Sequence, residues 1–63
     1  MMNEADTIKF IDVETSEESV VIIRYDESSV AICLSVKANS DLEVVMTKKD
    51  ALALLEALRK AVK

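Results

Sequence analysis

Apolar residues along this chain form four short runs with strand-like character, followed by a longer run with helical spacing. The strand-like runs are residues 7–14, 19–25, 30–37 and 42–46. In the third run, apolar residues alternate with small or polar ones at a period of two, which is the spacing of a strand with one buried face. Short polar segments rich in Ser, Glu, Asp and Asn separate the runs and predict turns. Short turns favour an antiparallel meander.

The fifth run predicts a C-terminal amphipathic helix. Thr47 suits the N-cap position, and Asp50, three residues later, takes the place of the acid in a capping box. At 3.6 residues per turn, most apolar residues from Ala51 to Val62 fall on one side, and polar residues such as Lys60 fall on the other. We therefore expect an α+β fold: a four-stranded antiparallel meander followed by one C-terminal helix packed on one sheet face (ββββα).

We expect a single domain over residues 7–63 and a flexible N-terminus over residues 1–6. One helix covers only one face of a sheet, so apolar residues on the other face of this domain would stay exposed in a monomer. A 63-residue chain also buries a small core, and its one cysteine cannot form an internal disulfide. We therefore expect a homodimer or higher oligomer, formed through the uncovered face or an edge strand. The expected interface residues are Val21, Ile23, Tyr25, Ala31, Cys33 and Val45.

The residue types that the sequence lacks argue against an enzyme. His, Gly and Pro are absent, and Cys33 is the only cysteine. Without His the usual general base near neutral pH is missing, and without Gly neither a P-loop nor a dinucleotide-binding loop can form. Cys33 lies in mid-strand between apolar neighbours, so we interpret it as a small buried hydrophobic residue and not as a nucleophile. We expect a non-enzymatic protein with no cofactor and no metal site.

Charge is divided unevenly along the chain, whose net charge is −4. Residues 1–31 hold eight acids against two cations, and residues 32–63 hold six cations against four acids. The acidic half is either ordinary solubilising charge or a docking surface for a protein with a basic surface. The candidate partner-binding residues are Glu14, Glu17, Glu18, Asp26 and Glu27.

The start of the chain does not resemble a secretory leader. Residues 1–6 lack both a basic start and an apolar stretch, and no apolar run approaches the roughly 18 residues of a membrane span. We therefore expect a cytoplasmic protein with a reduced Cys33 and no membrane partner.

Two resemblances suggest what such a protein does. The predicted element order resembles that of the positive-cofactor family of single-stranded DNA-binding coactivators, whose dimers bind strands across their sheets. This resemblance implies a nucleic-acid-binding dimer as an alternative function. The basic and aromatic residues that the strands supply are few, namely Lys9, Arg24, Lys37, Phe10 and Tyr25. Because the chain also has a pI of about 4.6, we assign no binding residues from that family.

The junction at residues 44–51, VVMTKKDA, resembles small phage and bacterial accessory proteins in which the last strand runs directly into a Thr-x-x-acidic-Ala helix. This resemblance implies a compact protein that occludes a host machine. We expect a non-enzymatic, homo-oligomeric protein-binding module, and the resemblance suggests a phage or prophage inhibitor of a host defence or nucleic-acid enzyme. A small-ligand sponge formed between subunits is the remaining alternative.

Overall fold

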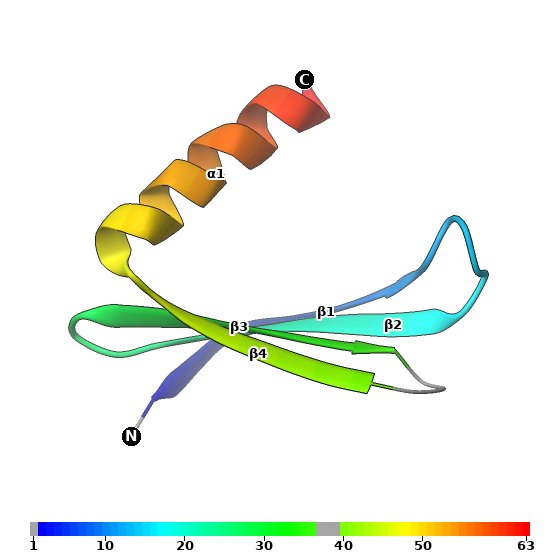
Figure 1. Cartoon of the computed structure of the whole chain (residues 1–63), viewed down its shortest axis with the longest axis horizontal. Helices are drawn as coiled ribbons and strands as arrows, with labels where there is room; N and C mark the ends of the chain where they lie inside the picture. The colour runs from blue at the N-terminus through cyan, green and yellow to red at the C-terminus, as the bar shows by residue number, and fades with distance from the viewer. Residues whose placement is uncertain (1, 37–39) are drawn as a thin grey trace.

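Four antiparallel strands and one C-terminal helix make up the fold (Figure 1). The computed structural model describes residues 2–36 and 40–63. The elements are β1 (Asn3–Ile11), β2 (Glu18–Tyr25), β3 (Ser29–Val36), β4 (Ser40–Thr47) and α1 (Lys48–Val62). The strands lie side by side in sequence order, and each pair is antiparallel. The predicted α+β meander with a C-terminal helix is confirmed.

The first strand lies nearer the N-terminus than the sequence pattern predicts. β1 begins at Asn3 and not at Thr7, so most of the segment 1–6, which we expected to be flexible, belongs to the sheet. The length of β2 explains this difference, because Asn3 pairs with Tyr25 at the far end of that strand. A register shift follows Glu4 and lets the polar start of the strand stay paired.

The β1–β2 turn forms around the Asp12 side chain. Its Oδ1 accepts hydrogen bonds from the backbone N–H groups of Glu14 at 2.8 Å and Thr15 at 3.2 Å. The backbone N–H of Asp12 also donates to the carbonyl oxygen of Glu17 at 2.9 Å, which closes the turn. Ser16 adopts φ 63°, in the left-handed region that glycine favours. Because the sequence has no glycine, a serine takes this position in the turn.

The β2–β3 turn depends on Asp26 in the same way. Asp26 Oδ1 accepts from the backbone N–H groups of Ser28 at 3.0 Å and Ser29 at 2.7 Å. These two hydrogen bonds favour the charged carboxylate and lower the pKa of Asp26 below its ordinary value. Because the pKa is lower in the folded chain, the stabilisation is present above the unfolded-state pKa and disappears as the pH falls through the folded-state pKa.

We expect Asp26→Asn to lower the urea midpoint of unfolding at neutral pH but not in acid. Wild type should exceed the variant above about pH 5, and the difference should shrink as the pH falls below the ordinary pKa of Asp and vanish once the carboxyl of the folded chain is protonated too. Urea titrations at both pH values measure this effect. Glu27→Gln, in the same turn, is the control, and an equal pH-dependent loss in that variant would contradict the role of Asp26.

Cross-strand partners point to the same side of a sheet, so the register divides the side chains between two faces. Lys48, the first residue of α1, has its Nζ 5.5 Å from the ring centre of Tyr25, which places the Tyr25 side of the sheet toward the helix. This inner face is largely apolar, and its apolar members include Ile8, Phe10, Val21, Ile23, Tyr25, Ile32, Leu34, Leu42, Val44 and Met46. Asn3, Asp6 and Ser19 also lie on it. The outer face mixes apolar and charged residues, including Lys9, Ile11, Glu18, Val20, Ile22, Arg24, Ala31, Cys33, Ser35, Asp41, Glu43 and Val45.

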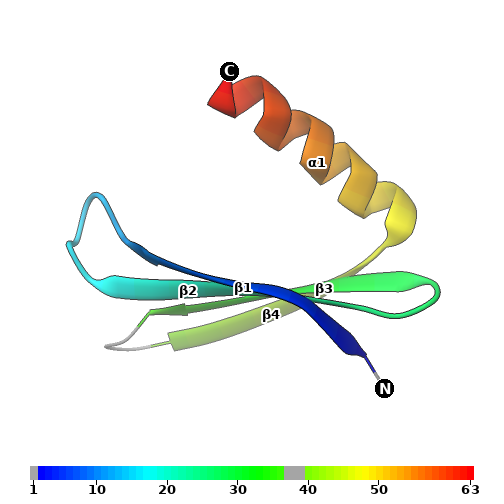
Figure 2. The same cartoon turned by 180° about the vertical axis from the view of Figure 1, so that it is seen from behind.

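The helix follows the last strand with no linking residue. Thr47 ends β4 and is also the N-cap, and its hydroxyl accepts from the backbone N–H of Asp50 at 3.1 Å, which confirms the predicted cap. α1 contacts β4 and β3 and then diverges from the sheet toward its C-terminus (Figures 1 and 2). No residue of α1 is buried. Within residues 2–36 and 40–63, no helix has the length and apolar character that a membrane span requires.

Very little of this chain is buried. Among the residues whose burial the structure describes, the only buried ones are Ala31, at 0% exposure, and Ser19, at 7%. Ser19 Oγ donates to the carbonyl oxygen of Glu17 at 3.2 Å, so the buried hydroxyl has a partner. The inner face of the sheet and the apolar side of α1 therefore remain open to solvent in a single chain.

Candidate functional site

The middle of the outer face holds a polar cluster that spans three adjacent strands. Arg24 Nη1 on β2 lies 3.8 Å from Glu43 Oε2 on β4. Cys33, on the strand between them, donates from Sγ to the same carboxylate oxygen at 3.2 Å. Ser35 Oγ donates to Asp41 Oδ1 at 2.7 Å, one pair further along the same strands. We call these five residues the outer cluster.

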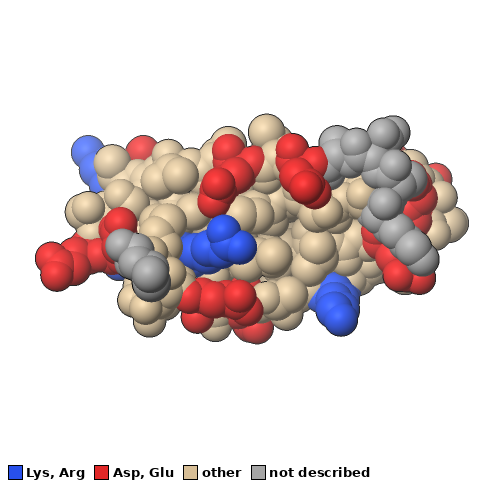
Figure 3. Space-filling model, turned by 90° about the horizontal axis from the view of Figure 1, so that it is seen from below, with Lys and Arg blue, Asp and Glu red and all other residues tan. Residues whose placement is uncertain are grey.

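The surroundings of the outer cluster are apolar in part. Val20 and Ile22 lie half-buried on β2, and Val45 on β4 is 61% exposed. Charged side chains of both signs are scattered among uncharged ones on this side of the molecule (Figure 3). The charged residues that the register places on the described part of the outer face are Glu4, Lys9, Glu18, Arg24, Asp41 and Glu43. Acids outnumber cations by four to two, so the face is weakly acidic.

Cys33 is half-buried in the outer cluster and not fully buried as we expected. Its thiol lies on the mixed outer face, where it finds a carboxylate partner. The hydrogen bond to Glu43, followed by desolvation, raises the pKa of the Cys33 thiol above its ordinary value. Since the thiolate is the nucleophile, this environment disfavours reaction at Cys33.

The five acidic candidates for partner binding do not lie together. Glu14 and Glu17 belong to the β1–β2 turn and Glu18 begins β2, whereas Asp26 and Glu27 belong to the β2–β3 turn. The two turns lie at opposite ends of the sheet in both ribbon views (Figures 1 and 2). A partner that contacts all five residues must therefore span the length of the sheet.

The six residues that we expected at an oligomer interface divide between the two faces. Four consecutive apolar residues in β2, 20–23, fit either face in the sequence, and only the pairing register assigns them. Val21, Ile23 and Tyr25 lie on the inner face, and Ala31, Cys33 and Val45 lie on the outer face. No single flat contact can therefore include all six.

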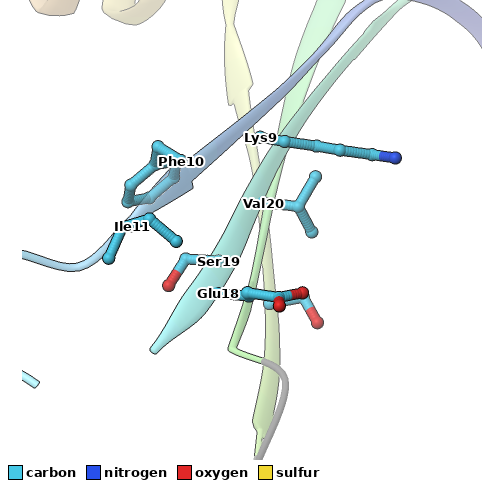
Figure 4. A pocket seen from close by; sticks show the side chains of 7 residues that line it. Lys9, Phe10, Ile11, Glu18, Ser19 and Val20 are labelled. Atoms are coloured by element: carbon cyan, nitrogen blue, oxygen red, sulfur yellow. The ribbon is translucent and has the colours of Figure 1, made fainter. Parts of the chain in front are cut away.

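A hollow of about 480 Å³ lies at the end of the sheet beside the β1–β2 turn (Figure 4). Phe10 and Ser19 project from one side of the strands there, and Lys9 and Val20 project from the other. Side chains on opposite faces do not enclose one volume, so this hollow in a single chain does not surround a small ligand. The ligand sponge between subunits stays a prediction.

The outer cluster is the feature that we did not predict. The alternation of Leu42, Glu43 and Val44 leaves Glu43 on a different face from its two apolar neighbours, which is a signal for a polar contact. Its partner Arg24 is two strands away, so the contact depends on the register of two hairpins. The residue pattern does not predict that register.

No three His, Cys, Asp or Glu side chains within residues 2–36 and 40–63 are grouped so that they could hold a metal ion. Comparisons of the chain with protein-family models, with curated proteins and with solved structures found no match. The element order that suggested both resemblances is present, but the functions that they imply stay predictions.

Proposed function

We propose that this chain is a non-enzymatic protein-binding module that acts as a homo-oligomer and docks a basic protein surface on the outer face of its sheet. The observation that supports this proposal best is the outer cluster together with exposed apolar side chains at its edge. Arg24 and Cys33 both contact Glu43, and Val45 lies beside them, 61% exposed. A surface that combines apolar side chains, an arginine and ordered polar groups has the make-up of a protein interface.

The charge of this face favours a basic partner. Four acids against two cations leave the described outer face net negative, and the acidic turns extend the negative charge to both ends of the sheet. Complementary charge accelerates association and discriminates against acidic partners. The resemblance to small phage proteins suggests that the partner is a host enzyme, which would make the module an inhibitor by occlusion.

The same geometry gives less support to single-stranded nucleic acid as the ligand. Phe10 and Tyr25, the residues available for base stacking, lie on the inner face, where the register also places the acidic Asp6, and where Lys48 lies near Tyr25. The outer face, which has cations, is net negative and would repel phosphates.

Site-specific photo-crosslinking in the native host tests the proposed surface. A p-benzoylphenylalanine side chain in place of Val45 lies on the outer face, and the same group in place of Ala53 lies on the polar side of α1. We expect one protein to be captured from position 45 and not from position 53. Equal capture from both positions, or capture of nucleic acid alone, would contradict the proposal.

The captured partner, once purified, allows a quantitative test. We expect the triple variant Glu18→Lys, Asp41→Lys and Glu43→Lys to bind it about tenfold more weakly or worse, because these substitutions reverse the charge of the docking face. Wild-type binding should also weaken as salt rises from about 0.05 to 0.5 M. Glu56→Lys on α1 is the control with the same chemical change. Unchanged, salt-insensitive binding by the triple variant would move the site away from this face.

A further inference from the structure

The apolar side of α1 and the inner face of the sheet form two uncovered walls. The helix wall consists of Leu54, Leu55, Leu58 and Val62, and Leu58 is 53% exposed. The sheet wall consists of Ile8, Phe10, Leu34 and Val44, and Ile8 is 50% exposed. A soluble monomer does not usually leave this many large apolar side chains in contact with water on facing elements.

The accessible surface area and the radius of gyration show how much more surface this chain exposes than a compact monomer. A folded monomer of 7.0 kDa exposes roughly 4,000 Å². This chain exposes 5226 Å², an excess of about 1,200 Å². Its radius of gyration is 12.7 Å, whereas a compact domain of 63 residues has about 10.6 Å.

The junction between β4 and α1 directs the helix away from its own sheet. Thr47 is both the last residue of β4 and the N-cap of α1, so no linking residue is free to bend. The cap hydrogen bond to Asp50 and the approach of Lys48 to the Tyr25 ring hold the first turn of the helix in its present direction. In this arrangement one chain covers neither wall, and another molecule can occupy both.

Charge identifies a second copy of this chain as a suitable occupant. Residues 48–63, the helical part, hold five cations against two acids, a net charge of +3. Residues 1–47 hold three cations against ten acids, a net charge of −7. The opposite net charges attract the helical part of one copy to residues 1–47 of another, and each copy has both an uncovered helix wall and an uncovered sheet wall.

We propose that the protein is a two-fold symmetric homodimer in which α1 of each copy packs against the sheet wall of the other. Removing the excess surface from both copies buries about 2,400 Å² in total, which lies in the range of obligate homodimers. This inference rests on the homo-oligomeric part of the proposed function and names the surface that joins the copies. It leaves the outer cluster of each copy exposed for a different protein.

Sedimentation equilibrium of the full chain over about 1 to 100 µM tests the assembly. We expect a mass of twice 7.0 kDa for the wild type and for Ala53→Glu, whose new charge lies on the polar side of α1. We expect Leu58→Glu to lose the dimer, because it places the same charge in the helix wall. A folded wild-type monomer, or a folded Leu58→Glu dimer, would overturn the inference.

A second measurement on the wild type does not depend on any variant folding. In a dimer reassembled from isotope-labelled and unlabelled chains, filtered NOE spectra should show contacts between Leu58 methyl groups of one copy and Phe10 ring protons of the other. Contacts between these residues only within one copy would mean that the helix closes on its own sheet. Intermolecular contacts at Val45 alone would mean that the outer faces join. Either result overturns this inference, whereas the crosslinking test at position 45 separately decides the partner site.

Discussion

Leu58→Ala should lower the free energy of unfolding of the assembled protein by about 2–5 kcal/mol, and Leu55→Ala by a similar amount. In one chain these leucines are 53% and 46% exposed, so their truncation would remove few contacts from a monomer. We expect the large loss because, in the proposed homodimer, the second copy buries both side chains against its sheet wall. Urea denaturation followed by circular dichroism, at two protein concentrations, measures the loss and its dependence on assembly.

Lys60→Ala is the control for this pair, because Lys60 lies on the polar side of the same helix. It should change the free energy of unfolding by no more than about 0.5 kcal/mol. Small and equal effects at all three positions would show that the helix wall stays exposed in solution.

Ala31→Leu should lower the free energy of unfolding by about 1–3 kcal/mol, because it overfills the centre of the sheet. Ala31 is 0% exposed, and its cross-strand neighbours are Arg24 and Val45. A leucine at this position must displace those side chains or bend β3. Since Ala31 is buried within a single chain, the loss should be the same at low and at high protein concentration, which urea denaturation can establish.

Val45→Leu adds a side-chain carbon beside the same site, but Val45 is largely exposed and its new atoms can extend into water. We expect its effect to stay within about 0.5 kcal/mol. If Ala31→Leu were equally mild, the packing at the centre of the outer face would be looser than the burial of Ala31 indicates.

The helix was the element most fully predicted. Its start depends on a local contact between Thr47 and Asp50, and the regular spacing of leucines repeats over several turns. The strand limits were less accurate at the N-terminus, because Asn3, Glu4 and Asp6 are polar and join β1 only through pairing with β2. A residue that is ordered by its partner strand has no signal of its own in the sequence.

The candidate site was predicted only in part, for the same physical reason. The acidic residues were identified one by one, but their separation to opposite ends of the sheet follows from the meander and its turns. The contact of Arg24 and Cys33 with Glu43 requires the register of three strands. A shift of one residue in either hairpin would send these side chains to opposite faces.

The sequence by itself determined the order of elements, the helix cap, the lack of histidine and glycine, and the apolar excess of the strands. These properties depend on residue type and on spacing within about one turn or one strand, where local sterics and hydrogen bonds dominate. The tertiary structure decided which apolar residues share a face, how far α1 diverges from the sheet, and which polar groups meet in the outer cluster. Those outcomes depend on pairing between residues that are distant along the chain, and the identity of each residue leaves that pairing open.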